Sequence, residues 1–156
     1  MANVDFGLDT AVPAPAVLAA AVDFSDRRPA LWPTIEPSVY RVHAVGDSWA
    51  EVTEGSRFLG TIWARERYDW ATPGTVRATV VDSNVFQPGG TWQLRAHDAG
   101  HATRLTIRSL RRARGLRGRI LGATLTVAGR SILAGNLQRT LGVLAERPAS
   151  AGEPAR

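Results

Sequence analysis

The C-terminal part of the chain contains a long apolar stretch that restricts how the remainder can fold. Residues 115–146 read GLRGRILGATLTVAGRSILAGNLQRTLGVLAE, with no proline before Pro148. The spacing predicts one helix, and at 3.6 residues per turn its apolar side chains fall on nearly every side. Such a helix is normally buried on more than one side. We therefore expect the upstream chain to wrap around it.

A membrane span is the alternative interpretation of the same stretch, because its length would suit a bilayer. Arg130 interrupts the apolar run, and Asn136, Gln138 and Arg139 follow it, so we favour a helix buried within a protein domain. Glycines in this helix each cost about 0.5–1 kcal/mol relative to alanine. They indicate close backbone approach or open space beside the helix. These glycines are Gly122, Gly129, Gly135 and Gly142.

Composition narrows the class of protein. A chain of 156 residues fits one domain with its own core. Cysteine is absent, and His43, His97 and His101 lack metal-ligand spacing, so we expect neither disulfides nor a metal or other cofactor. The first residues, MANVDFGLDT, do not resemble a signal peptide, and we expect a cytoplasmic protein.

The upstream chain changes its period along its length. A short strand over 6–12 precedes two short helices, the first opened by Pro13 and Pro15 and the second closed by Pro33. From Val39 to Leu110 the apolar period becomes two, with regular turn signals. This predicts an antiparallel meander. The expected strands lie near 39–45, 48–54, 61–71, 76–86, 91–97 and 102–110.

The turns allow the faces of this sheet to be assigned. Hairpins are expected at Pro73-Gly74, Pro88-Gly89 and Ala99-Gly100. Trp70 would then face Arg77, and opposed residues share a face. The expected inner face consists of Ile62, Ala64, Glu66, Tyr68, Trp70, Val81, Val85, Trp92, Leu94, Leu105 and Ile107.

One strand does not fit this assignment well. Val76, Ala78 and Val80 fall on the outer face, although they are apolar. A single bulge would reverse that strand.

The order of strand, two short helices, six-stranded meander and long final helix resembles the helix-grip fold of the START-like (SRPBCC) superfamily. The matching stretches are PAPAVLAAAVDFSDRRPALWP, VYRVHAVGDSWAEVTEGS and ARERYDWATPGTVRATVVDSNVFQPGGTWQL. Within the superfamily, the chain resembles bacterial polyketide cyclase/dehydrase and lipid-transport proteins. The resemblance implies an α+β fold, in which a curved antiparallel sheet of about seven strands wraps around the C-terminal helix. It places one domain over residues 1–148 and a disordered tail over 149–156, and it implies an internal apolar cavity.

Three residues are candidates for chemistry in that cavity. Glu66 lies on the expected inner face, where a carboxylate is costly unless it has a partner. It could be a general acid or base, an anchor for a ligand hydroxyl, or a structural carboxylate bonded to Tyr68 or to arginine. Arg77 could stack on Trp70 or polarise a ligand oxygen. Tyr68 could also polarise a ligand oxygen.

Other residues are candidates for contact with a ligand. Aromatic side chains on the inner face could line the cavity or be ordinary core, and Trp32 could gate the cavity mouth or simply anchor its helix. The helix would contribute its side from Gly122 to Ile132. The full candidate set is Trp32, Tyr40, Trp49, Tyr68, Trp70, Trp92, Leu125, Gly129 and Ile132.

The net charge of +5 comes entirely from arginine, and seven of the 19 arginines lie between Arg104 and Arg119. Coding bias in a GC-rich genome explains this composition, and a surface for anionic lipid is the functional alternative. The run lacks interleaved aromatic residues, so nucleic acid is not expected.

Three functions remain open after this reading. The first is a carrier or sensor for a hydrophobic small molecule or lipid, which requires only a cavity with a few polar anchors. The second is a cofactor-independent polyketide cyclase or dehydratase, and the third is a peripheral lipid-transfer protein.

Overall fold

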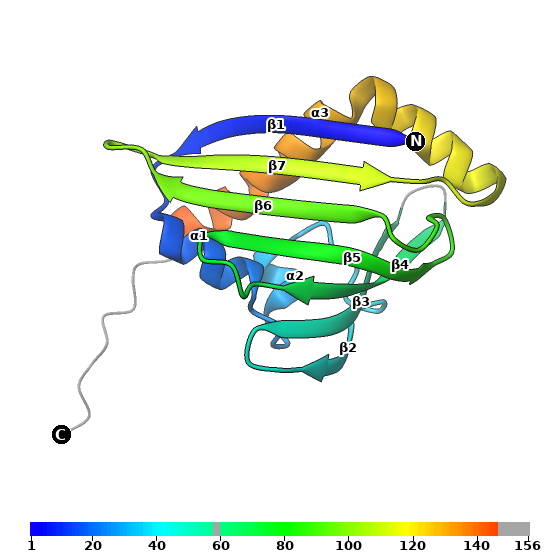
Figure 1. Ribbon diagram of the computed structural model, residues 1–156, viewed down its shortest axis with the longest axis horizontal. Coiled ribbons are helices and arrows are strands. Elements are labelled where there is room, and N and C mark those ends of the chain that lie inside the picture. Colours follow the sequence, from blue (N-terminus) through cyan, green and yellow to red (C-terminus); the bar gives the residue numbers. More distant parts are fainter. Residues whose placement is uncertain (58–59, 147–156) are drawn as a thin grey trace.

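Seven antiparallel strands form one curved sheet in the computed structural model, which describes residues 1–57 and 60–146. Two short helices follow the first strand, and a long helix follows the last (Figure 1). This architecture confirms the predicted helix-grip fold. The elements are β1 (Ala2–Thr10), α1 (Ala14–Ala21), α2 (Arg28–Leu31), β2 (Arg41–Val45), β3 (Trp49–Arg57), β4 (Thr61–Asp69), β5 (Thr75–Ser83), β6 (Thr91–Asp98), β7 (Thr103–Arg111) and α3 (Gly115–Glu146).

The strand order is β1-β7-β6-β5-β4-β3-β2. Strands β2 to β7 therefore lie side by side in chain order, and β1 lies beside β7 instead of β2. The first strand pairs with the last because α1 and α2 carry the chain from one edge of the sheet to the other. The helices lie on one side of the sheet (Figure 1). Fully buried side chains from both layers, including Val17, Val52, Leu94 and Leu105, form the core between them.

Only part of α3 is buried, so the expectation that the sheet wraps it on several sides is wrong. The helix packs mainly along β1, at the edge of the sheet, with smaller contacts to α1 and α2. Its buried residues are Gly118, Gly129, Leu137, Thr140 and Leu141. By length and composition alone, α3 could cross a membrane. Of the 18-residue apolar stretch on which this statement rests, 11% is buried inside the protein. Edge packing leaves one side of the first half of α3 exposed.

The glycines of α3 have different surroundings. A Cβ at Gly129 would lie 2.8 Å from Val4 Cγ2, so this glycine allows the close approach of α3 to β1. No atom lies within 4 Å of the position that a Cβ would take at Gly135. Neither residue lines the chamber or the groove described below, and Gly129 packs against β1 instead of taking the expected place in the cavity lining.

The registers around β5 correct the predicted faces. Tyr68 pairs with Ala78 and Asp69 pairs with Arg77, because a bulge between Arg65 and Glu66 shifts the β4–β5 pairing by one residue. Val76, Ala78 and Val80 are buried, whereas Val81 is exposed.

The predicted Pro88-Gly89 hairpin is also wrong. Ala78 pairs with Trp92, and the backbone N–H of Gly89 donates to Val80 O at 2.9 Å. Gly89 therefore lies at the base of a loop rather than at the tip of a tight turn. In the β6–β7 hairpin Leu94 pairs with Ile107, which is two residues from the expected register and preserves the inner face.

The expected tail over 149–156 lies outside the described residues, as does the last part of the predicted domain from 147 to 148.

Substitution of two glycines in α3 is expected to have opposite effects on stability. A Cβ at Gly118 would lie 2.2 Å from the backbone oxygen of Val85, so Gly118→Ala forces the helix away from that loop. We expect a loss of about 1–3 kcal/mol in the free energy of unfolding, the usual cost of overpacking. Gly135→Ala meets no neighbour and should gain up to about 1 kcal/mol from helix propensity. Urea unfolding of both variants tests this pair, and equal shifts would contradict the helix position.

Candidate functional site

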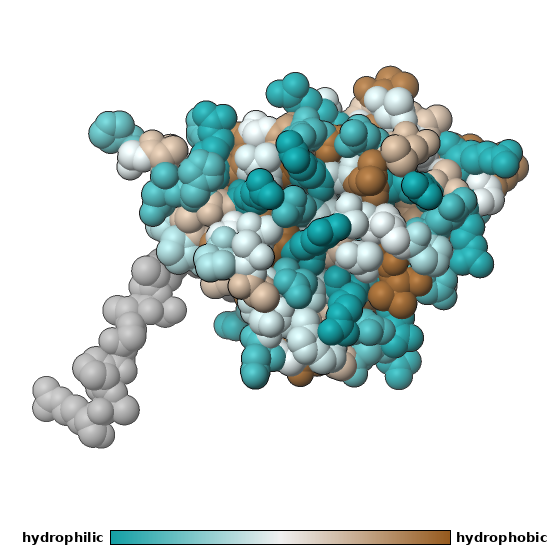
Figure 2. Space-filling view, in the orientation of Figure 1, coloured by the Kyte–Doolittle hydropathy of each residue, from teal (hydrophilic) through white to brown (hydrophobic). Residues whose placement is uncertain are grey.

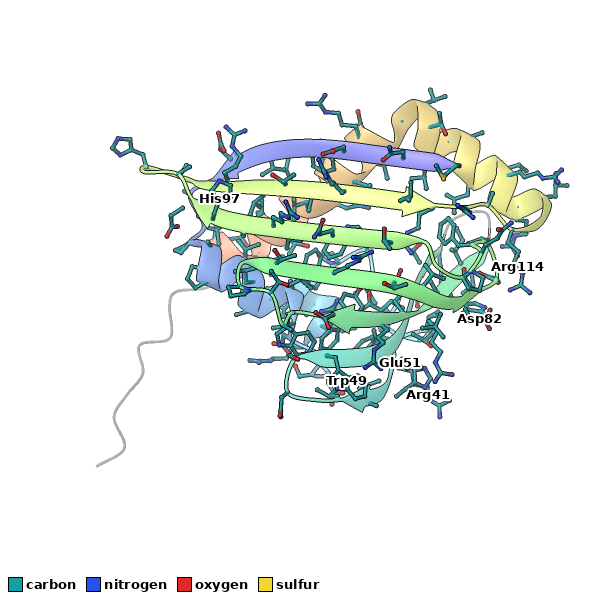
Figure 3. All side chains as sticks on the ribbon, viewed as in Figure 1. Arg41, Trp49, Glu51, Asp82, His97 and Arg114 are labelled. Atoms are coloured by element: carbon teal, nitrogen blue, oxygen red, sulfur yellow. The ribbon has the colours of Figure 1, made fainter. Side chains whose placement is uncertain are left out.

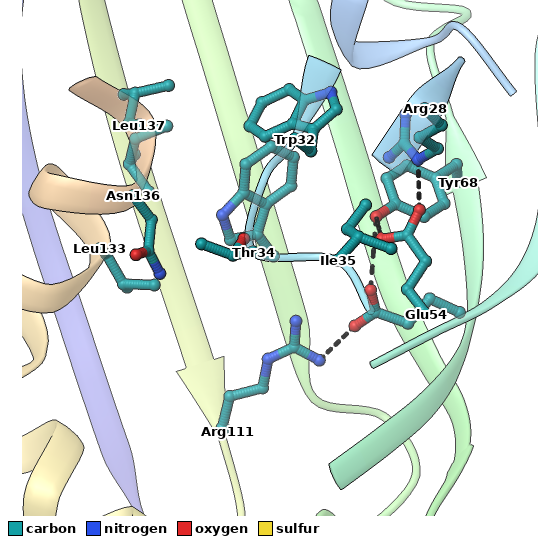
Figure 4. A pocket seen from close by; sticks show the side chains of 13 residues that line it. Arg28, Trp32, Thr34, Ile35, Glu54, Tyr68, Arg111, Leu133, Asn136 and Leu137 are labelled. Atoms are coloured by element: carbon teal, nitrogen blue, oxygen red, sulfur yellow. Dashed lines mark hydrogen bonds and ion pairs between the residues drawn. The ribbon is translucent and has the colours of Figure 1, made fainter. Parts of the chain in front are cut away.

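A chamber lies between the inner face of the sheet, the α2 segment and the second half of α3 (Figure 4). Its volume is about 250 Å³. Polar side chains from the sheet occupy one side and apolar side chains of α3 the other. The chamber is lined by Arg28, Trp32, Thr34, Ile35, Glu54, Glu66, Tyr68, Trp92, Ile107, Arg111, Leu133, Asn136 and Leu137.

A larger groove of about 740 Å³ adjoins the chamber along the middle of α3. Its helical side is formed by residues that include Leu121, Leu125 and Ile132. Six residues line both the chamber and the groove, so the two spaces are neighbours. These shared residues are Thr34, Ile35, Trp92, Arg111, Leu133 and Asn136.

Four charged side chains and one tyrosine form a chain of contacts across the chamber (Figure 4). Arg28 pairs with Glu54, and the hydroxyl of Tyr68 donates to Glu54 Oε2 at 3.0 Å. The same hydroxyl lies 3.4 Å from Glu66 Oε2. At the other end, Arg111 Nη1 donates to Glu66 Oε1 at 2.5 Å. Two arginines thus balance two carboxylates, which makes the burial of all four charges tolerable.

Strand alternation places three of these groups on one face. Glu54 follows Ala50 and Val52, both of which are fully buried, at a spacing of two along β3. Glu66 and Tyr68 have the same spacing on β4. Successive side chains of a strand point to opposite faces, so residues two apart share one. The chemistry of the chamber is therefore built on the rigid sheet.

Arg28 is fixed by backbone and aromatic contacts as well as by its ion pair. Its Nη1 donates to Ala21 O at 3.0 Å and to Asp23 O at 3.3 Å. Its guanidinium lies 4.4 Å from the ring centre of Phe24 and 5.1 Å from that of Tyr68. Burial alone would lower the pKa of Arg28, but the Glu54 carboxylate outweighs this effect and raises the pKa above its ordinary value. Arg28 is a permanently charged structural group.

Tyr68 remains protonated at neutral pH. Burial raises its pKa well above the ordinary value of 10, and the nearby carboxylates of Glu54 and Glu66 raise it further. A phenol has one hydrogen to donate, and Glu54 accepts it at the shorter distance. Glu66 Oε2 therefore retains capacity to accept a hydrogen bond from another donor.

Several of the predicted site residues do meet in one place. Trp32, Glu66, Tyr68 and Trp92 all line the chamber. The rings of Trp32 and Trp92 form an edge-to-face pair with centres 6.5 Å apart, while Trp32 Nε1 donates to Ala20 O at 3.0 Å. Leu125 and Ile132, predicted to line the cavity, line the adjoining groove.

Two other candidates lie on the outer face of the sheet, which contradicts their expected position. Arg77 is exposed because the β4–β5 pairing shifts by one residue at Val81, an extra residue of β5 opposite the step from Arg65 to Glu66, so Arg77 cannot act on a ligand in the chamber. Trp49 lies beneath Arg67, whose guanidinium is 4.0 Å from its ring centre. In Figure 3 Trp49 lies near Glu51, another residue of β3.

Trp70 and Tyr40 also do not line either space. Trp70 stacks on Phe24 with ring centres 5.7 Å apart, and both half-buried rings pack against the core. The hydroxyl of Tyr40 is buried and has no hydrogen-bond partner within residues 1–57 and 60–146. Burial raises the pKa of Tyr40 to about 12.

Arg28, Glu54 and Arg111 are functional candidates that the sequence reasoning missed. Alternation could have found Glu54, since it continues the buried series of Ala50 and Val52. It could also have found Arg111, because Ile107 and Ser109 precede it on the same face. Arg111 was instead grouped with the other arginines of the 104–119 run. The position of Arg28 depends on tertiary packing of α2, for which the sequence carries no periodic signal.

The fold has clear relatives among solved structures. TTHA0849 from Thermus thermophilus matches with a TM-score of 0.74 and 13% identity, over 92% of this chain and 97% of that chain. A START superfamily protein from Mycobacterium smegmatis matches at 0.72 and 14%, over 92% and 99%. The Zhui aromatase/cyclase from Streptomyces matches at 0.73 and 16%, over 96% and 97%.

The chain therefore has the helix-grip fold of the START-like superfamily, as its sequence predicted. Identities this low show the fold alone, because one such scaffold hosts unrelated functions. No protein-family model matches the chain. Comparison with curated protein sequences also gives no match.

The two tyrosines of the chain should titrate abnormally. At pH 10, where an ordinary tyrosine is half ionised, we expect little tyrosinate absorbance from the folded protein. Tyr40 should ionise near pH 12, and Tyr68 should stay protonated well above pH 10 as long as the protein is folded. In the unfolded chain Tyr68 has the ordinary pKa of about 10. Its raised pKa in the folded protein therefore contributes fully to the free energy of unfolding below about pH 10. This contribution is lost as the pH rises above about 10, because only the unfolded chain then releases the proton. Tyr68→Phe should remove this alkaline loss, and an unchanged titration in that variant would contradict the assignment.

Proposed function

We propose that the protein binds an amphipathic small molecule, with the ligand's polar end in the chamber and its apolar body in the groove, as a carrier or sensor. The observation that carries this proposal is the continuity of a charged chamber with a larger, mainly apolar groove through six shared residues. The groove volume of about 740 Å³ falls in the range typical of small-molecule sites. The fold supports the general partner class, a hydrophobic small molecule.

Glu66 and Arg111 supply complementary polar groups for the ligand. Glu66 Oε2 can accept a hydrogen bond from a ligand hydroxyl, because the nearby hydroxyl of Tyr68 donates its one hydrogen to Glu54. Arg111 uses Nη1 for Glu66, and a guanidinium has five N–H donors. The pair therefore suits a ligand that presents a hydroxyl beside a carbonyl or another oxygen acceptor.

The groove supplies the apolar contacts. Leu121, Leu125 and Ile132 of α3 line it, together with Ile62 of β4 and Phe86. Burial of apolar surface stabilises a bound ligand by roughly 25 cal/mol per Å² before the costs of association. Specificity would come from the chamber and most of the affinity from the groove.

The electrostatics favour binding over acid catalysis. Burial and the two carboxylates raise the pKa of Tyr68 well above 10, so its phenol is a hydrogen-bond donor and a poor proton donor at neutral pH. Proton donation by Tyr68 is thus unfavourable.

A second function is supported by the same ion pair. A charged Glu66 beside Arg111 could remove a proton from carbon while the guanidinium stabilises the enolate oxygen. This arrangement would suit a cyclase or dehydratase acting on a substrate with β-carbonyl groups.

Filling the junction of the two spaces should abolish ligand binding. Asn136 lines both the chamber and the groove, so Asn136→Trp places an indole between them. Gln138→Trp makes the same addition at an exposed position two residues away on α3. We expect native mass spectrometry to show a retained small molecule on the wild type and on Gln138→Trp, and none on Asn136→Trp. Circular dichroism confirms folding of both variants, and equal retention in the two would contradict the proposed site.

The enzymatic alternative has its own test. If Glu66 is a base, the protein should accelerate enolisation of an aryl 1,3-diketone, measured by enol absorbance. Glu66→Gln keeps the side-chain shape and should lower that rate by about 10²–10⁴, the usual contribution of a general base. Gln138→Trp should leave it unchanged. No acceleration by the wild type would leave the carrier or sensor as the function.

A further inference from the structure

The outer side of α3 carries an exposed apolar row that neither the chamber nor the groove uses. It consists of Leu116, Ile120, Ala123 and Val127, here called the outer stripe. Spacings of four, three and four residues place these side chains on one helix face. Leu116 is 73% exposed, Ile120 46% and Val127 89%. Figure 2 shows hydrophobic atoms at the rim of the molecule near the first half of α3.

Exposed arginines flank this stripe, and α3 itself carries no acidic residue before Glu146. Arg112, Arg119 and Arg130 form no ion pair with any residue in the described part of the chain. On a helix of 3.6 residues per turn, Arg119 and Arg130 fall on the same flank of the outer stripe. The sequence contains no aspartate or glutamate between Asp98 and Glu146. The outer stripe therefore lies on a positively charged surface.

The structure divides the arginine run of residues 104–119, which sequence analysis treated as one surface. Arg104 pairs with Asp9 and Arg108 with Asp5, through β7 and β1. Arg111 enters the chamber, and Arg114 pairs with Asp82 (Figure 3). Within the run, Arg112 and Arg119 keep exposed charges without an ion pair in the described residues, just before α3 and in its second turn.

We propose that the outer stripe docks the protein on an anionic lipid bilayer, with α3 lying in the plane of the membrane surface. Apolar side chains would enter the region between headgroups and acyl chains, while Arg112, Arg119 and Arg130 contact lipid phosphates. A second copy of this chain fits less well, because a two-fold contact through the stripe brings its flanking arginines together with no acid to neutralise them. The surface suits a partner that is both apolar and negatively charged.

Docking differs from insertion across the bilayer. Although α3 is long and apolar enough to span a membrane, Gly129, Leu137 and Leu141 are buried against the rest of the domain. Spanning would expose this core, whereas surface docking uses only side chains that are already exposed.

Docking through the outer stripe would bring the groove on the opposite side of α3 close to the membrane. Leu121, Leu125 and Ile132 line the groove, so one helix separates the ligand space from the proposed membrane surface. A docked protein could exchange an apolar ligand with the bilayer along a short path. This inference goes beyond ligand binding and does not require that the ligand itself be a lipid.

Sedimentation with vesicles tests the apolar part of the proposal. The wild-type protein should pellet with vesicles of phosphatidylcholine and phosphatidylserine at low salt, and much less with pure phosphatidylcholine. Val127→Glu places a charge in the stripe and should weaken binding by at least about tenfold. Val45→Glu makes the same change at a position on β2 that is 57% exposed, and should have a smaller effect.

The charged part requires a control for net charge. The double variant Arg119→Gln/Arg130→Gln should lose about 25-fold in affinity, from about fivefold for each arginine near an anionic surface. Arg77→Gln/Arg95→Gln removes the same charge from exposed positions on β5 and β6 and should lose much less. Added salt should weaken wild-type binding.

Three outcomes would overturn the proposal. One is equal binding to neutral and anionic vesicles. Another is an equal loss in the two double variants. The third is a wild-type dimer in analytical ultracentrifugation that Val127→Glu converts to a monomer, which would assign the outer stripe to an interface between copies. Native mass spectrometry in the absence of vesicles reports separately on the ligand site.

Discussion

The buried chain from Arg28 through Glu54, Tyr68 and Glu66 to Arg111 is the interaction on which the cavity depends. It joins α2, β3, β4 and β7, so it fixes the short helix over the sheet while it keeps polar groups in the chamber. Removing one member would leave a buried charge without its partner, which typically costs about 3–5 kcal/mol. The same contacts therefore maintain the shape of the site and provide its chemistry.

Sequence patterns predicted the fold well because the fold depends on periodicity and turn signals. Period-two alternation, the two proline-bounded helices and the apolar C-terminal stretch gave the correct element order. The inner positions of Glu66, Tyr68 and Trp92 followed from the same alternation. Arg77 was misplaced because the register shifts by one residue at Val81 of β5, and such a shift moves the side chains before it to the other face. The apolar Val76, Ala78 and Val80 indicated a bulge, but the sequence did not show where it lies.

The misjudged burial of α3 has a different cause. All-round apolarity shows that a helix avoids water on several sides, but not which surfaces cover it. The sheet covers one side through Gly129 and the second half of the helix, and the ligand groove lies along another. The remaining side bears the exposed Leu116 and Val127. Apolar composition alone cannot distinguish a protein core, a ligand groove and a lipid surface.

These three surfaces impose different requirements on one helix. Close packing on β1 needs a small residue at Gly129, where a larger one would meet Val4. The groove requires open space beside Leu121, Leu125 and Ile132. Core packing stabilises the domain whether or not a ligand or membrane is present, whereas the groove and outer stripe leave apolar surface exposed until each is occupied. Such exposure opposes solubility, and its extent along α3 is the reason why an occupant is proposed for each of the two surfaces.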